Sequence, residues 1–252
     1  MRRTLKAISL AAALAACSHT ASAPPTLQTA EHVERVQHTS AQRQSGRFRG
    51  LMSEHFGFSV WARDAVVIGD LAAARDALRL LADYAYTDVV PGAWLPRVRA
   101  LQDDARDAAR AESIGEVARG VARLGGACGS CHAATGGGPA LHGAAPERYP
   151  PEHDSFPDRM FRHQRAMSAL WAGLVAPSTA IWDEGAATLA AASAELDVET
   201  PLRQSLRDGL AQLQQLAERA RLATNQVERA DSYAALLVSC VSCHERAWSP
   251  IF

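Results

Sequence analysis

A five-residue pattern occurs at two places in the chain and constrains its fold and chemistry more than any other feature. Residues 128–132 are Cys-Gly-Ser-Cys-His, and residues 240–244 are Cys-Val-Ser-Cys-His. In this C-x-x-C-H pattern two thiols lie about one helical turn apart, and a histidine directly follows the second thiol. The pattern is typical of c-type haem attachment, in which the two thiols form thioether bonds to the vinyl groups of the haem. The sequence therefore predicts two covalently bound haem c groups.

Each residue type in the pattern has its own expected role. The cysteines attach the haem, and the histidine that follows them lies beneath the iron as its proximal ligand. The predicted thioether residues are Cys128, Cys131, Cys240 and Cys243, and the predicted proximal ligands are His132 and His244.

A C-x-x-C pair on its own is also compatible with a redox dithiol, a structural disulfide or half of a zinc site. A thioredoxin-like dithiol needs a βαβ context, and the sequence shows no such pattern. The two pairs are separated by about 110 residues, much further than the ligand pairs of zinc fingers and ribbons. Neither alternative accounts for a histidine at the same place after both pairs.

The N-terminus has the features of a bacterial secretory signal. Three basic residues precede an apolar run at residues 8–16, which is too short to span a bilayer. The run leads into Leu-Ala-Ala-Cys at residues 14–17, which resembles a lipobox, so residues 1–17 are predicted to be a signal peptide with Cys17 as the lipidated residue. An ordinary cleaved signal is the alternative. We expect a periplasmic protein that is lipid-anchored to the outer membrane, a compartment that also suits covalent haem attachment.

Charge limits the partners that the chain is expected to bind. The formal net charge is −1, with acidic and basic residues interspersed along the sequence. This balance argues against nucleic acid and against a strongly charged partner surface. Redox partner proteins are the expected partners, and the oligomeric state is left open.

Apolar residues recur at helical spacing in four segments before each motif, without the alternation typical of strands. Residues 18–45 are predicted to be a flexible tether, 46–135 the first bundle, 136–156 a linker and 157–252 the second bundle. Helix starts are marked by Asp70, by the S-x-x-E capping box at residues 113–116 and by Thr200-Pro201. The third helix of the second half is expected to end near Asn225.

The two halves repeat one another. Both begin with Met-x-x-His, at Met52/His55 and Met160/His163, an offset of 108 residues (160 − 52), while the motifs are offset by 112 (240 − 128). In the helix before the first motif, the apolar residues and both cysteines share one stripe, spaced alternately by three and four. We therefore predict an all-α fold of two tandem antiparallel four-helix bundles, each with a covalently bound haem at the end of its fourth helix. Trp61, Trp171 and Trp182 are expected in the core.

Each half resembles the cytochrome c′ and cytochrome c-556 group, the class II c-type cytochromes. The resemblance rests on C-x-x-C-H at the end of a fourth helix and covers most of residues 46–135 and 157–248. In that family the first helix faces the sixth coordination position of the haem iron. This chain departs from the family in being a tandem pair and in carrying both Met and His on each first helix.

Met and His three residues apart lie on the same helical face, so either could reach the iron. We expect bis-histidine ligation, with His55 and His163 as the distal ligands. Met52 and Met160 are the alternative ligands, and they would raise the reduction potential relative to bis-histidine ligation. An open, five-coordinate iron is the third possibility.

Six-coordinate iron changes its oxidation state without needing a substrate site. The predicted function is therefore electron transfer in the periplasm or at a membrane surface, by a protein that is not an enzyme. One alternative is a gas-binding or sensing protein of the cytochrome c′ type, for nitric oxide or carbon monoxide. Another is a dihaem peroxidase, which needs an open iron beside acid–base groups.

Overall fold

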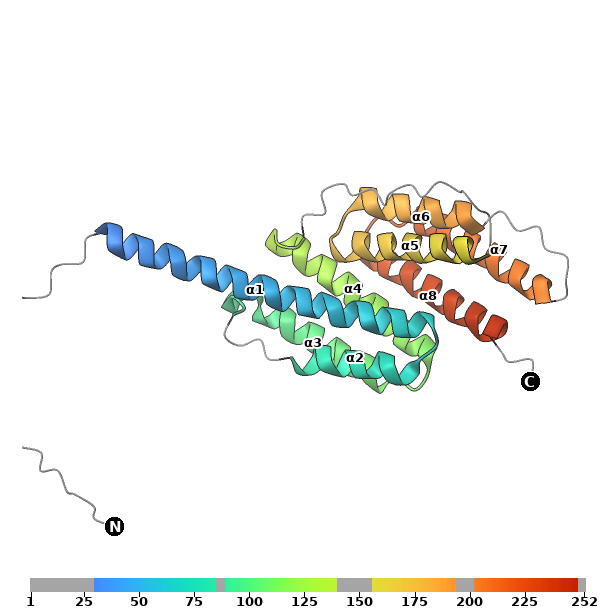
Figure 1. The fold of residues 1–252 in the computed structure, drawn as a ribbon, viewed down its shortest axis with the longest axis horizontal. Helices are drawn as coiled ribbons and strands as arrows, with labels where there is room; N and C mark the ends of the chain where they lie inside the picture. Colours follow the sequence, from blue (N-terminus) through green and yellow to red (C-terminus); the bar gives the residue numbers. More distant parts are fainter. Residues whose placement is uncertain (1–29, 85–88, 140–155, 194–201, 249–252) are drawn as a thin grey trace, which may run out of the picture. The chain divides into compact units, whose positions relative to one another are not determined.

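The structure, a computed structural model, describes residues 30–84, 89–139, 156–193 and 202–248 (Figure 1). Within these ranges the chain forms eight α-helices and one 3-10 turn, and it forms no strand, which confirms the all-α prediction. The helices are α1 (Ala30–Val67), α2 (Leu71–Asp83), α3 (Leu95–Arg110), α4 (Ile114–Thr135), α5 (Phe156–Val175), α6 (Thr179–Ser193), α7 (Leu202–Ala220) and α8 (Gln226–Trp248), with the 3-10 turn at Gly92–Trp94.

The chain divides after Gln44 into two compact units, residues 1–44 and 45–252. The described part of the first unit is the beginning of α1. Because α1 starts at Ala30, the predicted tether is wrong for residues 30–45, where neither Gly nor Pro interrupts the helix before Gly46. The rest of that tether and the signal segment with Cys17 lie outside the described residues.

The helix boundaries of the first half follow the predicted capping chemistry. Asp70 Oδ1 accepts a hydrogen bond from the backbone N–H of Ala73 at 2.9 Å, which starts α2. Ser113 Oγ accepts from the N–H of Glu116 at 3.3 Å, and the Glu116 carboxylate accepts from the N–H of Ser113 at 3.1 Å. This reciprocal pair is the predicted capping box of α4. At its other end α4 is terminated by Gly136, whose φ of 64° favours glycine.

The start of α8 differs from the sequence-based expectation. Asn225, expected at the end of the preceding helix, is instead the N-cap of α8. Its Oδ1 accepts hydrogen bonds from the N–H groups of Val227 at 3.1 Å and Glu228 at 3.0 Å. The preceding helix ends earlier, at Ala220. The predicted helix start at Thr200-Pro201 lies outside the described residues.

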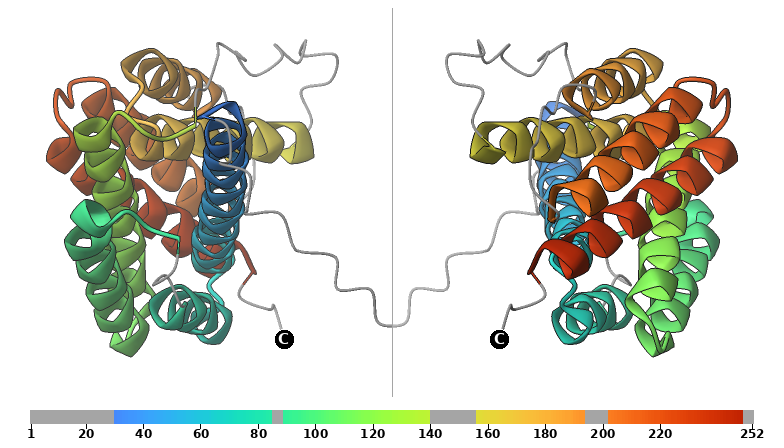
Figure 2. Two further views of the ribbon diagram at one scale, coloured as in Figure 1. Left: turned by 90° about the vertical axis from the view of Figure 1, so that its left-hand side faces the viewer. Right: turned by 90° about the vertical axis from the view of Figure 1, so that its right-hand side faces the viewer.

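The two helices that carry the motifs, α4 and α8, pack directly against each other (Figures 1 and 2). They are antiparallel, since Gly126 of α4 faces Ala230 of α8 while Gly129 faces Gln226. The motifs therefore lie toward opposite ends of this helix pair. Around it, α2, α3 and α4 pack in chain order, as do α5, α6, α7 and α8, and α5 also packs against α4.

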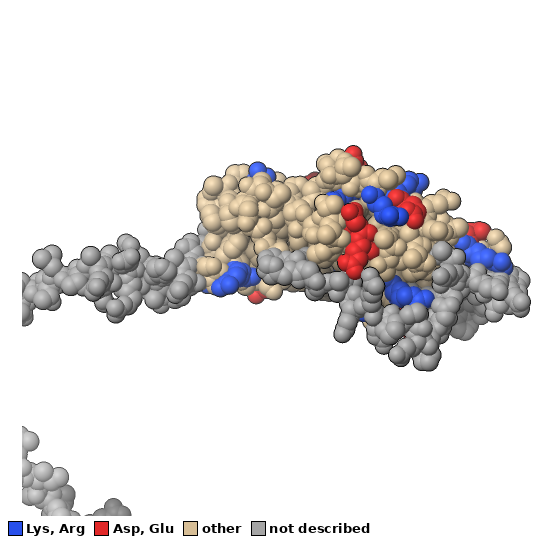
Figure 3. Space-filling model, turned by 90° about the horizontal axis from the view of Figure 1, so that it is seen from above, with Lys and Arg blue, Asp and Glu red and all other residues tan. Residues whose placement is uncertain are grey.

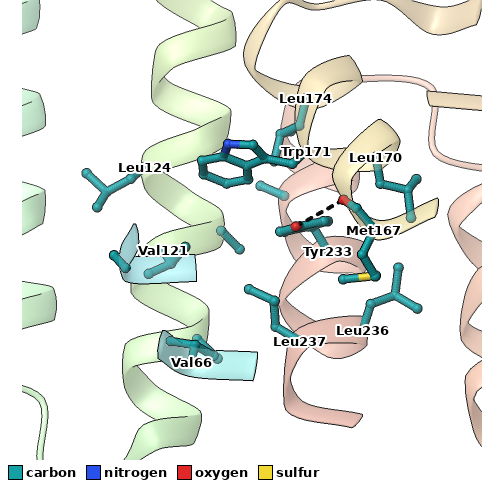
Figure 4. Close-up of a cluster of buried hydrophobic side chains, with 14 of the residues drawn as sticks. Val66, Val121, Leu124, Met167, Leu170, Trp171, Leu174, Tyr233, Leu236 and Leu237 are labelled. Carbon is teal, nitrogen blue, oxygen red and sulfur yellow. Dashed lines mark hydrogen bonds between the residues drawn. The ribbon is translucent and has the colours of Figure 1, made fainter. Parts of the chain in front are cut away.

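A continuous hydrophobic core extends across both halves (Figure 4). Trp171 of α5 is 1% exposed, and a Cβ at Gly125 of α4 would lie 2.5 Å from its ring, so the indole rests on the backbone of α4. The same ring lies 5.5 Å from that of Tyr233 of α8, whose hydroxyl donates to the Met167 carbonyl at 3.2 Å. The two predicted halves are thus packed together through a shared core rather than merely joined in sequence.

The three tryptophans expected in the core divide into two kinds. Trp171 and Trp182 are 1% and 0% exposed, as predicted. Trp61 is 45% exposed, so that part of the prediction is wrong. The buried stripe of α1 runs through Ala62, Ala65 and Val66, and a residue one position before Ala62 is turned about 100° away from it.

Charged side chains are interspersed on the surface of the described residues. On the face shown in Figure 3, basic and acidic side chains lie close to one another. Several ion pairs are local, such as Arg106 with Asp103 at 2.6 Å and Arg110 with Asp107 at 3.0 Å. Exposed pairs of this kind contribute about 0–1 kcal/mol each to stability. None of the described helices is long and apolar enough to cross a membrane.

Candidate haem-binding sites

The first motif occupies the last two turns of α4. The predicted stripe is buried along this helix: Val117, Val121 and Leu124 are 0%, 1% and 2% exposed. Cys128 continues the stripe and packs against the core, and both it and Cys131 are partly buried. The thiols therefore face apolar surroundings near the end of a capped helix.

The second motif occupies the equivalent part of α8. Tyr233, Leu236 and Leu237 are fully buried, and Cys240 is partly buried against the same core. Val241 is 3% exposed, whereas the equivalent residue of the first motif is Gly129. Cys243 and His244 are partly buried near the end of the helix.

The environment of the cysteines bears on the alternatives to haem. Burial raises the pKa of the Cys128 thiol to about 12, and that of the Cys240 thiol also to about 12. A redox dithiol has instead a lowered thiol pKa, which makes it a nucleophile. No disulfide joins Cys128 to Cys131 or Cys240 to Cys243.

The two motifs do not converge on a common metal site. Across the described parts of the chain, no three His, Cys, Asp or Glu side chains surround a point that could hold an ion. A structural zinc site needs four such ligands, so the arrangement does not fit zinc shared between the two pairs. The motifs form two separate candidate sites.

Both motif histidines are oriented by a hydrogen bond through the same ring nitrogen. His132 Nδ1 lies 2.8 Å from the carbonyl oxygen of Val175, and His244 Nδ1 lies 2.7 Å from that of Val67. A carbonyl can only accept, so Nδ1 is the protonated nitrogen in both rings. Nε2 is then left with its lone pair, the form in which a histidine binds a metal.

An apolar cluster separate from the main core lies beside the first motif. Its buried members are Leu51 and Val90, packed by Phe48, Met52, Tyr84, Val89, Trp94, Leu95 and Val98. The turn after α4 connects this cluster to His132. A Cβ at Gly137 would lie 4.0 Å from the Trp94 ring, and one at Gly138 would lie 3.0 Å from His132 Nδ1. These residues form apolar surroundings beside the first motif, of the kind that would suit a haem.

The candidate distal ligands lie on the first helix of each half. His55 and His163 are 7% and 9% exposed, whereas Met52 and Met160 are partly exposed. The His55 ring packs edge-on against Tyr84 at 5.2 Å, and His163 Nε2 lies 3.4 Å from Ser193 Oγ. Burial lowers the pKa of His55 to about 4, so this imidazole is neutral at physiological pH, as a ligand must be.

In the second half the helix alignment relates these residues to the motif. Tyr233 of α8 donates to Met167 of α5, and Gln226 donates to Leu174, so the two helices are antiparallel. Continuing this alignment for two more turns brings Met160 level with Cys240. The Met-x-x-His of α5 thus lies at the same level as the motif of its own half.

Sequence reasoning missed three contributors to the sites. The carbonyls of Val67 and Val175 are backbone groups with no sequence signature of their own, although their offset of 108 residues (175 − 67) equals that of the Met-x-x-His pairs. Gly138, interpreted as part of a linker, has a φ of 108° and covers the His132 ring. The sequence offered one signal for its role, because Gly138 follows His132 by only six residues.

Gly129 has no Cβ, which lets α5 and α8 pack closely against α4 beside the first motif. A Cβ at this position would collide with Gln226 Nε2 and the Leu174 carbonyl. Gly129→Ala should therefore lower the free energy of unfolding by about 1–3 kcal/mol in urea denaturation. Gly115→Ala, on the same helix, would bring its Cβ near only Arg119 Nη1, at 4.0 Å, and should be neutral or stabilise by up to about 1 kcal/mol. Equal effects of the two changes would contradict the close approach.

The lowered pKa of His55 predicts a specific sensitivity to acid. In the chain without bound haem, the unfolded form binds a proton at this residue below about pH 6.5, whereas the folded form does so only near pH 4. The contribution of neutral His55 to the free energy of unfolding is thus fully present above pH 6.5. It falls by about 2–3 kcal/mol as the pH decreases toward 4. His55→Leu should flatten the difference between unfolding free energies measured at pH 7 and pH 4.5, and an unchanged pH dependence would contradict the burial.

Comparison with known proteins gave no similar protein on which to base a function. No family model matches the chain, and neither a curated protein nor a solved structure does.

Proposed function

We propose that this chain is a dihaem c-type cytochrome, built as two haem-carrying four-helix bundles in tandem, which transfers electrons between redox partner proteins. The observation that carries the proposal is that both C-x-x-C-H histidines donate Nδ1–H to a backbone carbonyl and keep Nε2 for iron. Two motifs with the same C-x-x-C-H pattern and the same histidine geometry favour the same chemistry at both.

The residues that would hold the haems have distinct tasks. Cys128 and Cys131 attach one haem and Cys240 and Cys243 the other, while His132 and His244 are the proximal ligands. A bound haem supplies a one-electron Fe(III)/Fe(II) couple. The chain fixes the orientation of the His132 imidazole through Nδ1, and the apolar cluster around Leu51 and Val90 would give the first haem apolar surroundings.

We assign the distal positions to His55 and His163, with Met52 and Met160 as the alternatives. The histidines are the more deeply buried members of each pair, and burial keeps His55 neutral. Six-coordinate iron in a rigid, apolar site changes oxidation state with little rearrangement, which suits an electron carrier.

One observation favours gas binding at the second site as a second candidate function. His163 Nε2 already lies near Ser193 Oγ, at 3.4 Å. If His163 keeps that contact and Met160 does not ligate, the second iron has an open position for carbon monoxide or nitric oxide.

Visible spectra of the oxidised and reduced protein, with and without carbon monoxide, test these candidates. Electron transfer predicts sharp low-spin bands that do not change with carbon monoxide. A broad high-spin component that shifts with the gas, amounting to half of the haem, would favour gas binding at one site. A spectrum without haem bands would contradict both.

We also propose export and lipid anchoring, from the signal and lipobox at residues 1–17. Cys17→Ser should move the protein from the membrane fraction to the soluble periplasmic fraction while leaving both haems in place, because residue 17 lies outside both motifs. Fractionation followed by haem staining measures this. Unchanged membrane association of the variant would contradict lipidation at Cys17.

A further inference from the structure

The two proximal histidines find their hydrogen-bond acceptors in the opposite halves of the chain. His132 of the first half bonds to Val175, the last residue of α5, and His244 of the second half bonds to Val67, the last residue of α1. The acceptors are offset by 108 residues (175 − 67) and the histidines by 112 (244 − 132). These offsets equal those of the repeat. Each half therefore supplies a carbonyl to the histidine of the other half, and we call this arrangement the exchange.

The local structure at the end of α1 leaves the Val67 carbonyl available. Gly69, with φ 79°, terminates the helix. Its N–H bonds to the Val66 carbonyl at 3.0 Å, and the N–H of Asp70 bonds to that of Ala65 at 2.9 Å, which together form a Schellman motif. Those two bonds occupy the carbonyls before Val67, and the Val67 carbonyl accepts from His244 instead.

The end of α5 also leaves a carbonyl available to a motif histidine, but through different contacts. Pro177 occupies the position of Gly69 and has no N–H, so it cannot bond to the Leu174 carbonyl. Gln226 Nε2 of α8 donates to that carbonyl instead, at 3.0 Å, and the side chain fits there because Gly129 has no Cβ. The next carbonyl, that of Val175, accepts from His132. In the first half, where Gly69 supplies its own N–H, the residue equivalent to Gln226 is Ile114.

We propose that each haem site is built from both halves of the chain: the motif supplies the cysteines and the histidine, and the end of the other half's first helix fixes that histidine. The inference rests on the proposed haem function and extends it. It makes the turn at Gly69 a positioning element for the second haem, and Gln226 a positioning residue for the first. Each site then depends on the end of a helix in the other half of the chain.

Gly69→Ala tests the proposal in the full chain. Alanine is strained at φ 79°, so the turn should relax and weaken the bond from His244 to the Val67 carbonyl. A weaker Nδ1–H bond makes the imidazole a poorer electron donor to iron. The reduction equilibrium of the second haem should therefore shift about tenfold toward the reduced form, which is 59 mV for one electron, while the first haem is unchanged.

Two further variants make the test specific. Ile68→Ala changes the neighbouring side chain, which is 71% exposed, and should alter neither potential. Gln226→Leu removes the donor to the Leu174 carbonyl and should shift the first haem but not the second. The two potentials are assigned with the variants Cys128→Ser/Cys131→Ser and Cys240→Ser/Cys243→Ser, each of which retains one haem.

A Gly69→Ala shift confined to the first haem, an equal shift of both haems, or no shift in a folded variant would overturn the proposal. If the variant does not fold, nuclear Overhauser contacts of the His244 ring N–H in the reduced wild-type protein decide the matter. Contacts to Val67 and Ile68 support the exchange, and contacts to Val175 and Ala176 overturn it. Absence of covalent haem from the wild-type protein would instead contradict the proposed function itself.

Discussion

Replacing Cys240 and Cys243 together with serine should halve the covalently bound haem per chain. The serine hydroxyl cannot form the thioether, so the second motif loses its attachment while the first retains both thiols. The haem content is measured from the absorbance of the pyridine complex per mole of protein, and from the mass of the denatured chain.

The matched change at Cys128 and Cys131 should remove the other half of the haem, and Cys17→Ser should remove none. Because Trp171 and Tyr233 place the two halves in a shared core, each single-haem protein should also unfold at a lower temperature than the wild type. Retention of all the haem by either double variant would show that the motif concerned is not an attachment site.

His55→Ala should convert the first haem from low-spin to high-spin iron and open it to carbon monoxide. If His55 is the distal ligand, its removal leaves the iron five-coordinate in the apolar surroundings of Leu51 and Val90. About half of the haem should then acquire a carbon monoxide-sensitive spectrum, since the second haem keeps His163. Visible and electron paramagnetic resonance spectra measure the two populations.

Met52→Leu is the matched control, because it preserves the volume of the side chain and lies on the same helical face. It should leave the spectrum low-spin. If Met52→Leu produces the high-spin form and His55→Ala does not, methionine is the distal ligand of the first haem. An unchanged spectrum in both variants would contradict ligation by either residue.

Much of the fold could be predicted because its boundaries depend on local chemistry. Asp70 and the capping box of Ser113 and Glu116 satisfy the free N–H groups of the helices that follow them, and such signals lie within four residues. Asn225 carries the same kind of signal, but the leucine-rich pattern before it obscured where one helix ends and the next begins. The helical start at Ala30 was missed because a polar composition does not exclude a helix.

The motif residues could be predicted for the same reason, since five consecutive residues carry the whole attachment signature. The surroundings of the motif histidines could not. Val67 and Val175 act through their carbonyls, which any residue possesses, and their partners lie 177 (244 − 67) and 43 (175 − 132) residues away. The sequence shows Gly69 in one half and Pro177 at the equivalent position of the other. Only the structure shows that Gln226 supplies the N–H that Pro177 lacks.

Whether both motifs carry a covalently bound haem is decided by the mass of the intact chain. The wild-type protein should be exported by cells that attach c-type haem, purified and measured under denaturing conditions, which release any cofactor held without a covalent bond. With a haem on each motif, the mature chain should be heavier than its polypeptide by two haem groups. A mass equal to that of the polypeptide, with or without the loss of two hydrogen atoms per C-x-x-C pair as disulfides, would contradict this expectation.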